Sequence, residues 1–283
     1  MDYQTPTNAE EAAALLSQDG AHALAGGTDL LVKLRAGAVT PRVVVDLKRV
    51  PRLRGIEHDA KGWRIGAATT CAEIGEHAAL ASAWPGVVEA LQLIGSTQIQ
   101  GRATLGGNLC NASPAADSVP ALIAAGAKCE VAGTKGQREV PVEQIVTGPG
   151  RNALKPGEFI LGFRLPEPPG RSGDAYLRLI PRTEMDIAVV GAGVSLTLDD
   201  QGVCTHARVA LGAVAATPLL VEAAARALIG TRVDDDALEA LGAAASAACK
   251  PIDDKRGTVA YRVKVAGVLA KRAARMAFER ATG

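Results

Sequence analysis

The chain has few aromatic residues and almost no net charge. Phe, Trp and Tyr make up only 3% of its 283 residues, and 31 Lys and Arg residues face 30 Asp and Glu residues, which leaves a formal net charge of +1. Single-stranded bases are bound by stacking on aromatic side chains, and a phosphate backbone is attracted by a positive field. Both absences argue against a nucleic-acid partner.

Long apolar runs and grouped cysteines are missing as well. No uninterrupted apolar run approaches the roughly 20 residues that cross a bilayer. The first residues, MDYQTPTNAEEAAALL, contain acids where a secretion signal has none. We therefore expect a cytoplasmic chain without a membrane span. The five cysteines, scattered without any CxxC pair, suggest neither a disulfide framework nor a metal or iron-sulfur ligand set. Redox chemistry therefore requires a bound organic cofactor.

Apolar residues are plentiful, at 48% of the chain, and they are patterned as helices and strands. The first 55 residues predict a helix capped by Thr7 or Asn8, a strand over 22–25, a Gly-rich turn, a helix over 29–36 and a strand over 43–47. This order is typical of a compact α/β unit.

The next block, residues 56–166, begins with a predicted hairpin over 56–67 and helices over 70–77 and 85–94. Residues 95–118 then lose all periodicity, being rich in Gly, Asn, Ser, Thr and Pro, and predict a long loop of functional importance. The remaining pattern predicts a helix over 119–125, a strand over 128–131, a short helix over 142–146 and a strand over 159–165.

A boundary is predicted at PEPPGRSGD, residues 166–174, because Pro, Gly and charged residues concentrate there. Three strands follow, over 176–180, 187–198 and 203–211, and then three helices, over 218–229, 235–248 and 258–280. The fold class is therefore α/β and α+β. Two N-terminal α/β subdomains, 1–55 and 56–166, precede a C-terminal domain, 174–283, with a three-stranded antiparallel sheet and helices on one face.

Two glycine doublets carry the clearest functional signal, Gly26 and Gly27 in AGGTD and Gly106 and Gly107 in TLGGN. In the first, amides without Cβ obstruction stand before a helix, which suits a phosphate or diphosphate. The alternative is that the glycines only form tight turns while Asp29 caps its helix. Neither doublet has the Rossmann spacing, and no Walker lysine follows. The GAG of VVGAGVSLTL lies inside a strand pattern and is assigned to sheet packing.

Five motifs in this order resemble the FAD-binding medium subunit of molybdenum-containing hydroxylases, the family of xanthine dehydrogenase and aerobic carbon monoxide dehydrogenase. The motifs are LAGGTDLLVKLRAG, GRATLGGNLCNASPAADSVPAL, PRTEMDIAVVGAGVSL, RVALGAVAATP and RGTVAYRVKVAGVLAKRA. The resemblance covers nearly the whole chain, and it implies that the first two subdomains cradle one FAD. Thr28 stands where some flavoproteins with a similar cradle attach FAD to a histidine, so noncovalent binding is expected.

The resemblance implies particular cofactor contacts. Backbone amides of both glycine segments would hold the diphosphate, while Asp117 and Arg178 match positions at the flavin. Taken alone, Asp117 could instead cap the helix near Val119, and Arg178 could be a solvated strand residue. Ile94 replaces an aromatic residue that some relatives place over the flavin ring. The cofactor-binding residues so assigned are Leu24, Ala25, Gly26, Gly27, Thr28, Asp29, Leu30, Ile94, Thr104, Leu105, Gly106, Gly107, Asn108, Asp117, Ile160 and Arg178.

The function implied by the resemblance is electron relay. A small subunit with iron-sulfur clusters would deliver electrons, FAD would pass them to an external acceptor such as NAD, a quinone or oxygen, and a large molybdopterin subunit would oxidise the substrate. A dimer of heterotrimers is expected. No triad or paired carboxylates occur in this chain, so no catalytic side chain and no metal ligand is predicted. The alternatives are a stand-alone flavin reductase and a scaffold subunit that has lost FAD; the intact glycine doublets argue against the scaffold.

Overall fold

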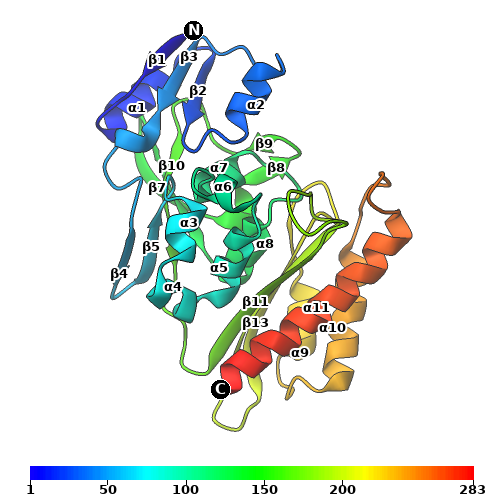
Figure 1. Ribbon diagram of the computed structural model, residues 1–283. Coiled ribbons are helices and arrows are strands. Elements are labelled where there is room, and N and C mark those ends of the chain that lie inside the picture. Colours follow the sequence, from blue (N-terminus) through cyan, green and yellow to red (C-terminus); the bar gives the residue numbers. More distant parts are fainter.

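The computed structural model describes all residues, 1–283, as three sheet-containing parts that follow one another from the N-terminus to the C-terminus (Figure 1). The first part is a parallel sheet with strand order β1-β3-β2. Asn8 begins the first helix, because its side chain accepts a hydrogen bond from the Glu11 amide. The elements are β1 (Asp2–Gln4), α1 (Ala9–Leu16), β2 (Ala21–Leu24), α2 (Leu30–Arg35), β3 (Val43–Asp46) and the 3-10 turn Leu47–Arg49.

The middle part is built on a five-stranded antiparallel sheet with strand order β4-β5-β10-β6-β7. The last of these strands in the sequence, β10, is the central strand of the sheet. The strands are β4 (Ile56–Asp59), β5 (Gly62–Gly66), β6 (Lys128–Gly133), β7 (Gly136–Pro141) and β10 (Phe159–Leu165), with a separate pair β8 (Val146–Gly148) and β9 (Arg151–Asn152) after the 3-10 turn Val142–Gln144. Strand β7 was not predicted, because its polar residues are exposed at the sheet edge.

Six helices of this part lie between the sheet and the C-terminal part (Figure 1). They are α3 (Cys71–Gly75), α4 (Ala78–Ala83), α5 (Pro85–Gln92), α6 (Thr97–Gln100), α7 (Leu105–Cys110) and α8 (Ser118–Ala124). The predicted loop over 95–118 is therefore wrong in part, because α6 and α7 lie within it. These helices span only four and six residues, too few to show a helical period.

The C-terminal part packs helices on a four-stranded antiparallel sheet with order β11-β12-β13-β14. Its two-residue edge strand β14 was not predicted. Gly193 belongs to β12 and lies against the main chain of Pro120 in α8, which confirms the assignment of GAG to sheet packing. The elements are β11 (Ser172–Leu179), β12 (Val190–Leu198), β13 (Cys204–Gly212), β14 (Leu219–Leu220), α9 (Glu222–Leu228), α10 (Asp235–Ala248) and α11 (Val259–Thr282).

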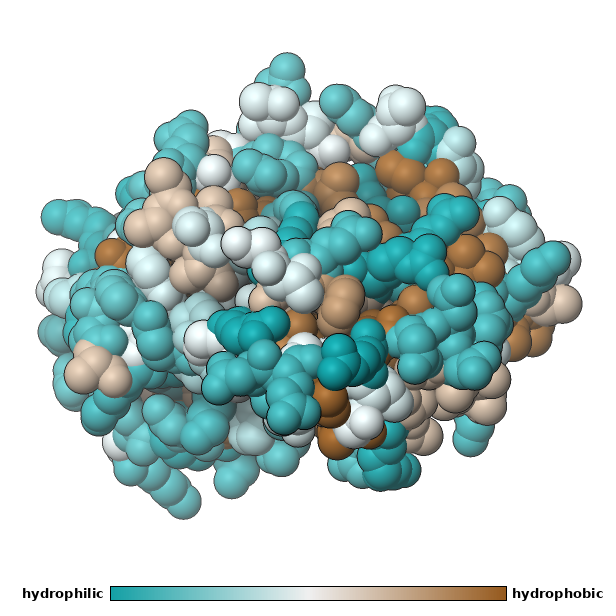
Figure 2. Space-filling model, turned by 90° about the horizontal axis from the view of Figure 1, so that it is seen from below, coloured by the Kyte–Doolittle hydropathy of each residue, from teal (hydrophilic) through white to brown (hydrophobic).

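Two buried apolar clusters hold these parts together. One runs through the first two parts and takes in Tyr176 of β11, and the other lies between the C-terminal sheet and α9 to α11. On the outside, the face seen from below is mostly hydrophilic or neutral, with apolar residues showing between the polar ones (Figure 2). None of the helices combines the length and apolar character that a membrane crossing requires. The predicted fold class is confirmed.

Candidate cofactor site

The first glycine segment connects β2 to α2 at the edge of the first sheet. Gly27 has a φ of +84°, a conformation that residues with a Cβ adopt only at a cost. Gly26 is required for a different reason, because a Cβ there would lie 1.9 Å from the carbonyl oxygen of Arg102. The main chain of the first segment therefore packs directly on the chain that enters the second segment. The two glycine doublets, far apart in sequence, lie side by side.

Four successive amides of the first segment are free to bind a ligand. The N–H groups of Gly26, Gly27, Thr28 and Asp29 donate to no other group of the chain. Successive unpaired N–H groups in a turn form a concavity that attracts anions. The Asp29 side chain does not cap α2 but accepts a hydrogen bond from Asn111 Nδ2 at 3.1 Å. The interpretation of Asp29 as a simple helix cap is therefore wrong.

A chain of side chains fixes the direction of the first of these amides, that of Gly26. Lys48 Nζ donates to the carbonyl oxygen of Ala25 at 3.1 Å and to Asp46 Oδ1 at 2.7 Å, and the Tyr3 hydroxyl donates to the same carboxylate. Burial disfavours the charge on Asp46, but the bonds from Lys48 and Tyr3 outweigh burial and lower its pKa. Because the carbonyl and the N–H of one planar peptide point in opposite directions, Lys48 turns the Gly26 N–H to the other side.

The amides of the second glycine segment are hydrogen-bonded within the fold. The amides of Leu105, Gly106 and Gly107 donate to the Thr69 carbonyl at 3.4 Å, the Ala67 carbonyl at 2.8 Å and the Thr104 hydroxyl at 3.1 Å. A Cβ on Gly106 would lie 2.8 Å from Ala67. The expectation that both segments offer free amides is therefore met by the first segment, whereas the second forms the capped start of α7.

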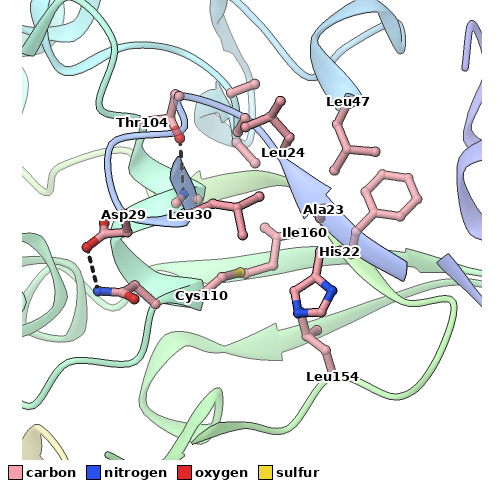
Figure 3. A pocket seen from close by; sticks show the side chains of 18 of the residues that line it. His22, Ala23, Leu24, Asp29, Leu30, Leu47, Thr104, Cys110, Leu154 and Ile160 are labelled. Atoms are coloured by element: carbon pink, nitrogen blue, oxygen red, sulfur yellow. Dashed lines mark hydrogen bonds between the residues drawn. The ribbon is translucent and has the colours of Figure 1, made fainter. Parts of the chain in front are cut away.

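Both segments line a cavity of about 620 Å³ (Figure 3). This volume lies within the usual range for a small-molecule or cofactor site. Ile94 after α5 and Ile160 on β10 contribute aliphatic surface. The predicted residues that line the cavity are Leu24, Ala25, Gly26, Gly27, Thr28, Asp29, Leu30, Ile94, Thr104, Gly106, Gly107, Asn108 and Ile160.

Several lining residues were not predicted. His22 projects from β2 toward Leu154 on the opposite wall, and Cys110 lies beside Ile160 (Figure 3). Lys33 lies one helical turn after Asp29, a spacing that places both on one face of α2 and could have been noticed in the sequence. Burial raises the pKa of the Cys110 thiol to about 12, so the thiol stays neutral and is a poor nucleophile. No group of His, Cys, Asp and Glu residues is arranged to hold a metal ion.

Three predicted residues do not line this cavity. Leu105 is buried beneath it in the core. Asp117 and Arg178 form a buried ion pair, with Arg178 Nη1 at 2.8 Å from Asp117 Oδ2, and the Tyr176 hydroxyl donates to Asp117 Oδ1 at 2.8 Å. The structure thus corrects two interpretations. Asp117 makes no side-chain cap to α8, and the Arg178 side chain is only 5% exposed instead of solvated.

The Asp117 pair joins α8 of the middle part to β11 of the C-terminal part. Burial raises the pKa of Asp117 to about 6, although the Arg178 guanidinium acts in the opposite direction. Burial also raises the pKa of Tyr176, so its hydroxyl remains a hydrogen-bond donor. Near this junction, the charged loop over 182–186 approaches the cavity, because the Met185 amide donates to the carbonyl of Gly95, next to Ile94, at 3.4 Å.

The geometry defines a class of protein first, one with a cofactor-sized cavity lined by unpaired amides between two parts that each combine a sheet with helices. Similarity to known proteins identifies the family. Residues 1–168 match the FAD binding domain in molybdopterin dehydrogenase, and residues 175–277 match the CO dehydrogenase flavoprotein C-terminal domain. The chain therefore belongs to the flavoprotein family of the molybdopterin dehydrogenases, and the resemblance inferred from the motifs is confirmed.

Individual relatives align over almost the full length. The carbon monoxide dehydrogenase medium chain of Afipia carboxidovorans is 37% identical, covering 99% of this chain and 97% of its own. The xanthine dehydrogenase FAD-binding subunit of Escherichia coli O157:H7 is 30% identical, covering 95% and 93%. A solved structure, the reconstituted CO dehydrogenase from Oligotropha carboxidovorans, superposes with a TM-score of 0.94 at 36% identity, covering 99% and 98%.

The residues present fit FAD. Four free amides offer a diphosphate site, and the cavity that contains them also has the aliphatic surface of Ile94 and Ile160 for the uncharged rings. A group with a central diphosphate and two apolar ends matches this distribution of polar and apolar lining.

Proposed function

We propose that this chain is the FAD-binding electron-transfer subunit of a molybdenum-containing hydroxylase or dehydrogenase. The observation that carries the proposal is the row of four unpaired amides, Gly26 to Asp29, in the cavity between two parts of a chain that matches the flavoprotein family along its length. When bound, FAD supplies both one-electron and two-electron redox chemistry. Electrons would enter from iron-sulfur clusters of a partner and leave to an external acceptor.

The chain's own residues bind and orient the cofactor in this proposal. The amides of Gly26, Gly27, Thr28 and Asp29 hold the diphosphate, and Lys48 fixes the peptide between Ala25 and Gly26, whose N–H is the first of the four. The remaining residues proposed to contact FAD are those that line the same cavity, with Ile94 and Ile160 as its aliphatic surface.

The buried pair of Asp117 and Arg178 is proposed to act at the flavin end. It lies where α8 meets β11, the junction through which the C-terminal part contacts the middle part. A carboxylate and a guanidinium held together by burial keep a fixed geometry. We propose the division 1–55, 56–166 and 174–283 for the three parts, with FAD between the first two and the C-terminal part closing the flavin end.

The partners are proposed from the relatives. Proteins named medium chain and FAD-binding subunit belong to multisubunit enzymes. One solved relative is described as lacking the Mo-pyranopterin moiety of the molybdenum cofactor. We propose a small iron-sulfur subunit and a large molybdopterin subunit, assembled as a dimer of heterotrimers, with substrate oxidation on the large subunit.

Cofactor binding is tested on the purified complex. It should be yellow with a flavin absorbance spectrum, and heating should release FAD that chromatography identifies. A colourless preparation that also fails to take up added FAD would leave the scaffold alternative in place. Catalysis of substrate oxidation by this chain alone, with FAD bound and no partner present, would favour the stand-alone reductase.

Relay is tested by rapid mixing of a chemically reduced iron-sulfur partner with the FAD-loaded chain. Bleaching of the flavin absorbance is expected, and the reduced flavin should reoxidise when the acceptor is added. The matched control is the same chain freed of FAD, with which the partner should stay reduced. Failure of the loaded chain to accept electrons from the partner would contradict the relay.

A further inference from the structure

Lys33 brings a positive charge to the cavity. Lys33 is an exposed residue of α2 that lines the cavity, and it has no carboxylate within ion-pair distance. Its Nζ donates instead to Asn111 Oδ1 at 2.6 Å. Asn111 follows α7, the helix that contains the second glycine doublet, so Lys33 reaches from the wall of the first segment to the wall of the second.

Lys155 also lines the cavity without an ion-pair partner, but it lies between β9 and β10, away from the glycine segments in the chain. The two acids of the lining, Glu158 and Asp29, already have partners. Glu158 is held by two bonds from Arg138, at 3.1 and 2.9 Å, and by the amide of Lys155. Asp29 is held by Asn111. The ammonium group of Lys33 therefore has only a neutral amide oxygen as its partner in a cavity that both glycine segments line.

A diphosphate brings full negative charges next to Asp29, itself an acid. The free amides oppose this charge only with partial dipoles. An ammonium bonded to a phosphate oxygen brings two opposite full charges together, whereas its bond to the neutral Asn111 oxygen joins a charge only to a dipole. Exchange of Asn111 for phosphate at the Lys33 nitrogen is therefore favourable, and Asn111 can keep its bond to Asp29.

We propose that Lys33 is the counter-cation of the cofactor's diphosphate, supplied by α2 at the junction of the two glycine segments. The inference rests on the proposed FAD site and adds to it a residue that determines affinity for the phosphate-bearing part. The alternative is a purely mechanical role, in which the bond from Lys33 to Asn111 holds the two walls of the cavity together and makes no contact with the cofactor. The two roles differ in their response to salt and to fragments of the cofactor.

The test uses the full chain freed of its cofactor and titrated separately with FAD, ADP and riboflavin at low and high ionic strength. Lys33→Met should weaken binding of FAD and ADP by about ten- to a hundredfold at low salt. It should leave riboflavin, which has no phosphate, unaffected, and it should flatten the dependence of FAD affinity on salt. Lys33→Arg should restore most of the affinity.

Arg35→Met is the matched control. Arg35 is exposed on the same helix, has no ion-pair partner and does not line the cavity, so FAD affinity and its salt dependence should stay at the wild-type value. Equal melting temperatures of the two cofactor-free variants would show that both fold.

The outcomes separate this inference from the proposed function. A wild-type chain that binds no FAD would defeat the proposed function itself. If the wild type binds FAD, an unchanged affinity in Lys33→Met would overturn the inference. A loss that is equal for FAD, ADP and riboflavin, with the salt dependence kept, would also overturn it and establish the mechanical role.

Discussion

The two glycine segments have nearly the same sequence pattern and opposite local structure. In AGGTD the chain turns, Gly27 takes a positive φ and four amides stay unpaired. In TLGGN the chain enters a helix, and the amides are occupied by Ala67, Thr69 and the Thr104 hydroxyl. The difference shows that a glycine doublet can either expose its amides to a ligand or allow close packing of the main chain. One segment presents its main chain to the cavity, while the other supplies the rigid surface on which the first one lies.

The contact between the segments gives the largest expected effect. Gly26→Ala should destabilise the protein by about 3 kcal/mol or more. The new Cβ would lie 1.9 Å from the Arg102 carbonyl oxygen, and a backbone atom cannot move aside as the end of a side chain can. FAD should be lost as well. Thermal melting and flavin content measure the two effects. A variant with wild-type melting temperature and full flavin occupancy would show that the segments do not touch.

Asp174, a buried carboxyl at the domain junction, combines a hydrogen-bonded oxygen and an unpaired oxygen in one side chain. Asp174 Oδ2 accepts from the Val87 amide at the start of α5, whereas its Oδ1 is buried without a partner. Arg280 donates to the Asp174 carbonyl and pairs with Glu89, so these charged groups face the same junction. Burial raises the pKa of Asp174 to about 7, with the Gly86 and Val87 amides and Arg280 opposing the rise and Glu89 adding to it.

The sign of its pH effect follows from this rise. The folded chain holds the proton up to about pH 7, whereas the unfolded chain releases it near pH 4, so stability should fall as the pH increases between these values, with a slope of about 1 kcal/mol per pH unit. Asp174→Asn should remove that part of the slope. Denaturant unfolding at several pH values in this range measures the slope for the wild type and for the variant. An identical slope in wild type and variant would contradict the raised pKa.

The positive φ of the first segment predicts a moderate effect. Gly27→Ala should lower the stability of the fold by about 1 to 2 kcal/mol, the strain of a residue with a Cβ in the left-handed region. It should also weaken FAD binding, because the chain relieves this strain by turning the amides away from the cofactor. Gly37→Ala is the control. Gly37 also has a positive φ, +68°, with open space around it, and it does not line the cavity. Both variants should lose stability, and only Gly27→Ala should lose affinity for FAD.

The second segment predicts the smallest effect. A Cβ on Gly107 would lie 2.8 Å from the Thr104 hydroxyl, a side-chain atom that can turn aside. Gly107→Ala should therefore cost about 0.5 to 1 kcal/mol through the weakened cap. Titration with FAD should show a smaller loss than in Gly27→Ala. If Gly107→Ala emptied the site as fully as Gly27→Ala, the second segment would be a phosphate cradle as well, and the contrast would fail.

Local signals in the sequence predicted most elements of the fold. The cap at Asn8, the strand that includes Val43 and the order of three strands before three helices are read from neighbouring residues, and the structure contains them. The family motifs predicted which two segments meet. Thirteen of the positions assigned from the family resemblance line one cavity.

The rest depends on residues that are distant in sequence. Nothing near Gly26 reveals that Arg102 will lie against it, and nothing near Ala25 reveals the bond from Lys48. The pairing of Asp117 with Arg178 joins elements 61 positions apart. Polar edge strand β7 has no apolar alternation to identify it. Such features are fixed by tertiary packing, which single-residue preferences do not record.

The central place of β10 has a consequence for biosynthesis. The sheet consists of two unconnected hairpins, β4 with β5 and β6 with β7, until residue 165 has left the ribosome and β10 joins them. Ile160, which lines the cavity, arrives on that same strand. Contacts between segments so distant form late in folding. The binding site for the prosthetic group is therefore incomplete in a nascent chain until more than half of the polypeptide has been translated.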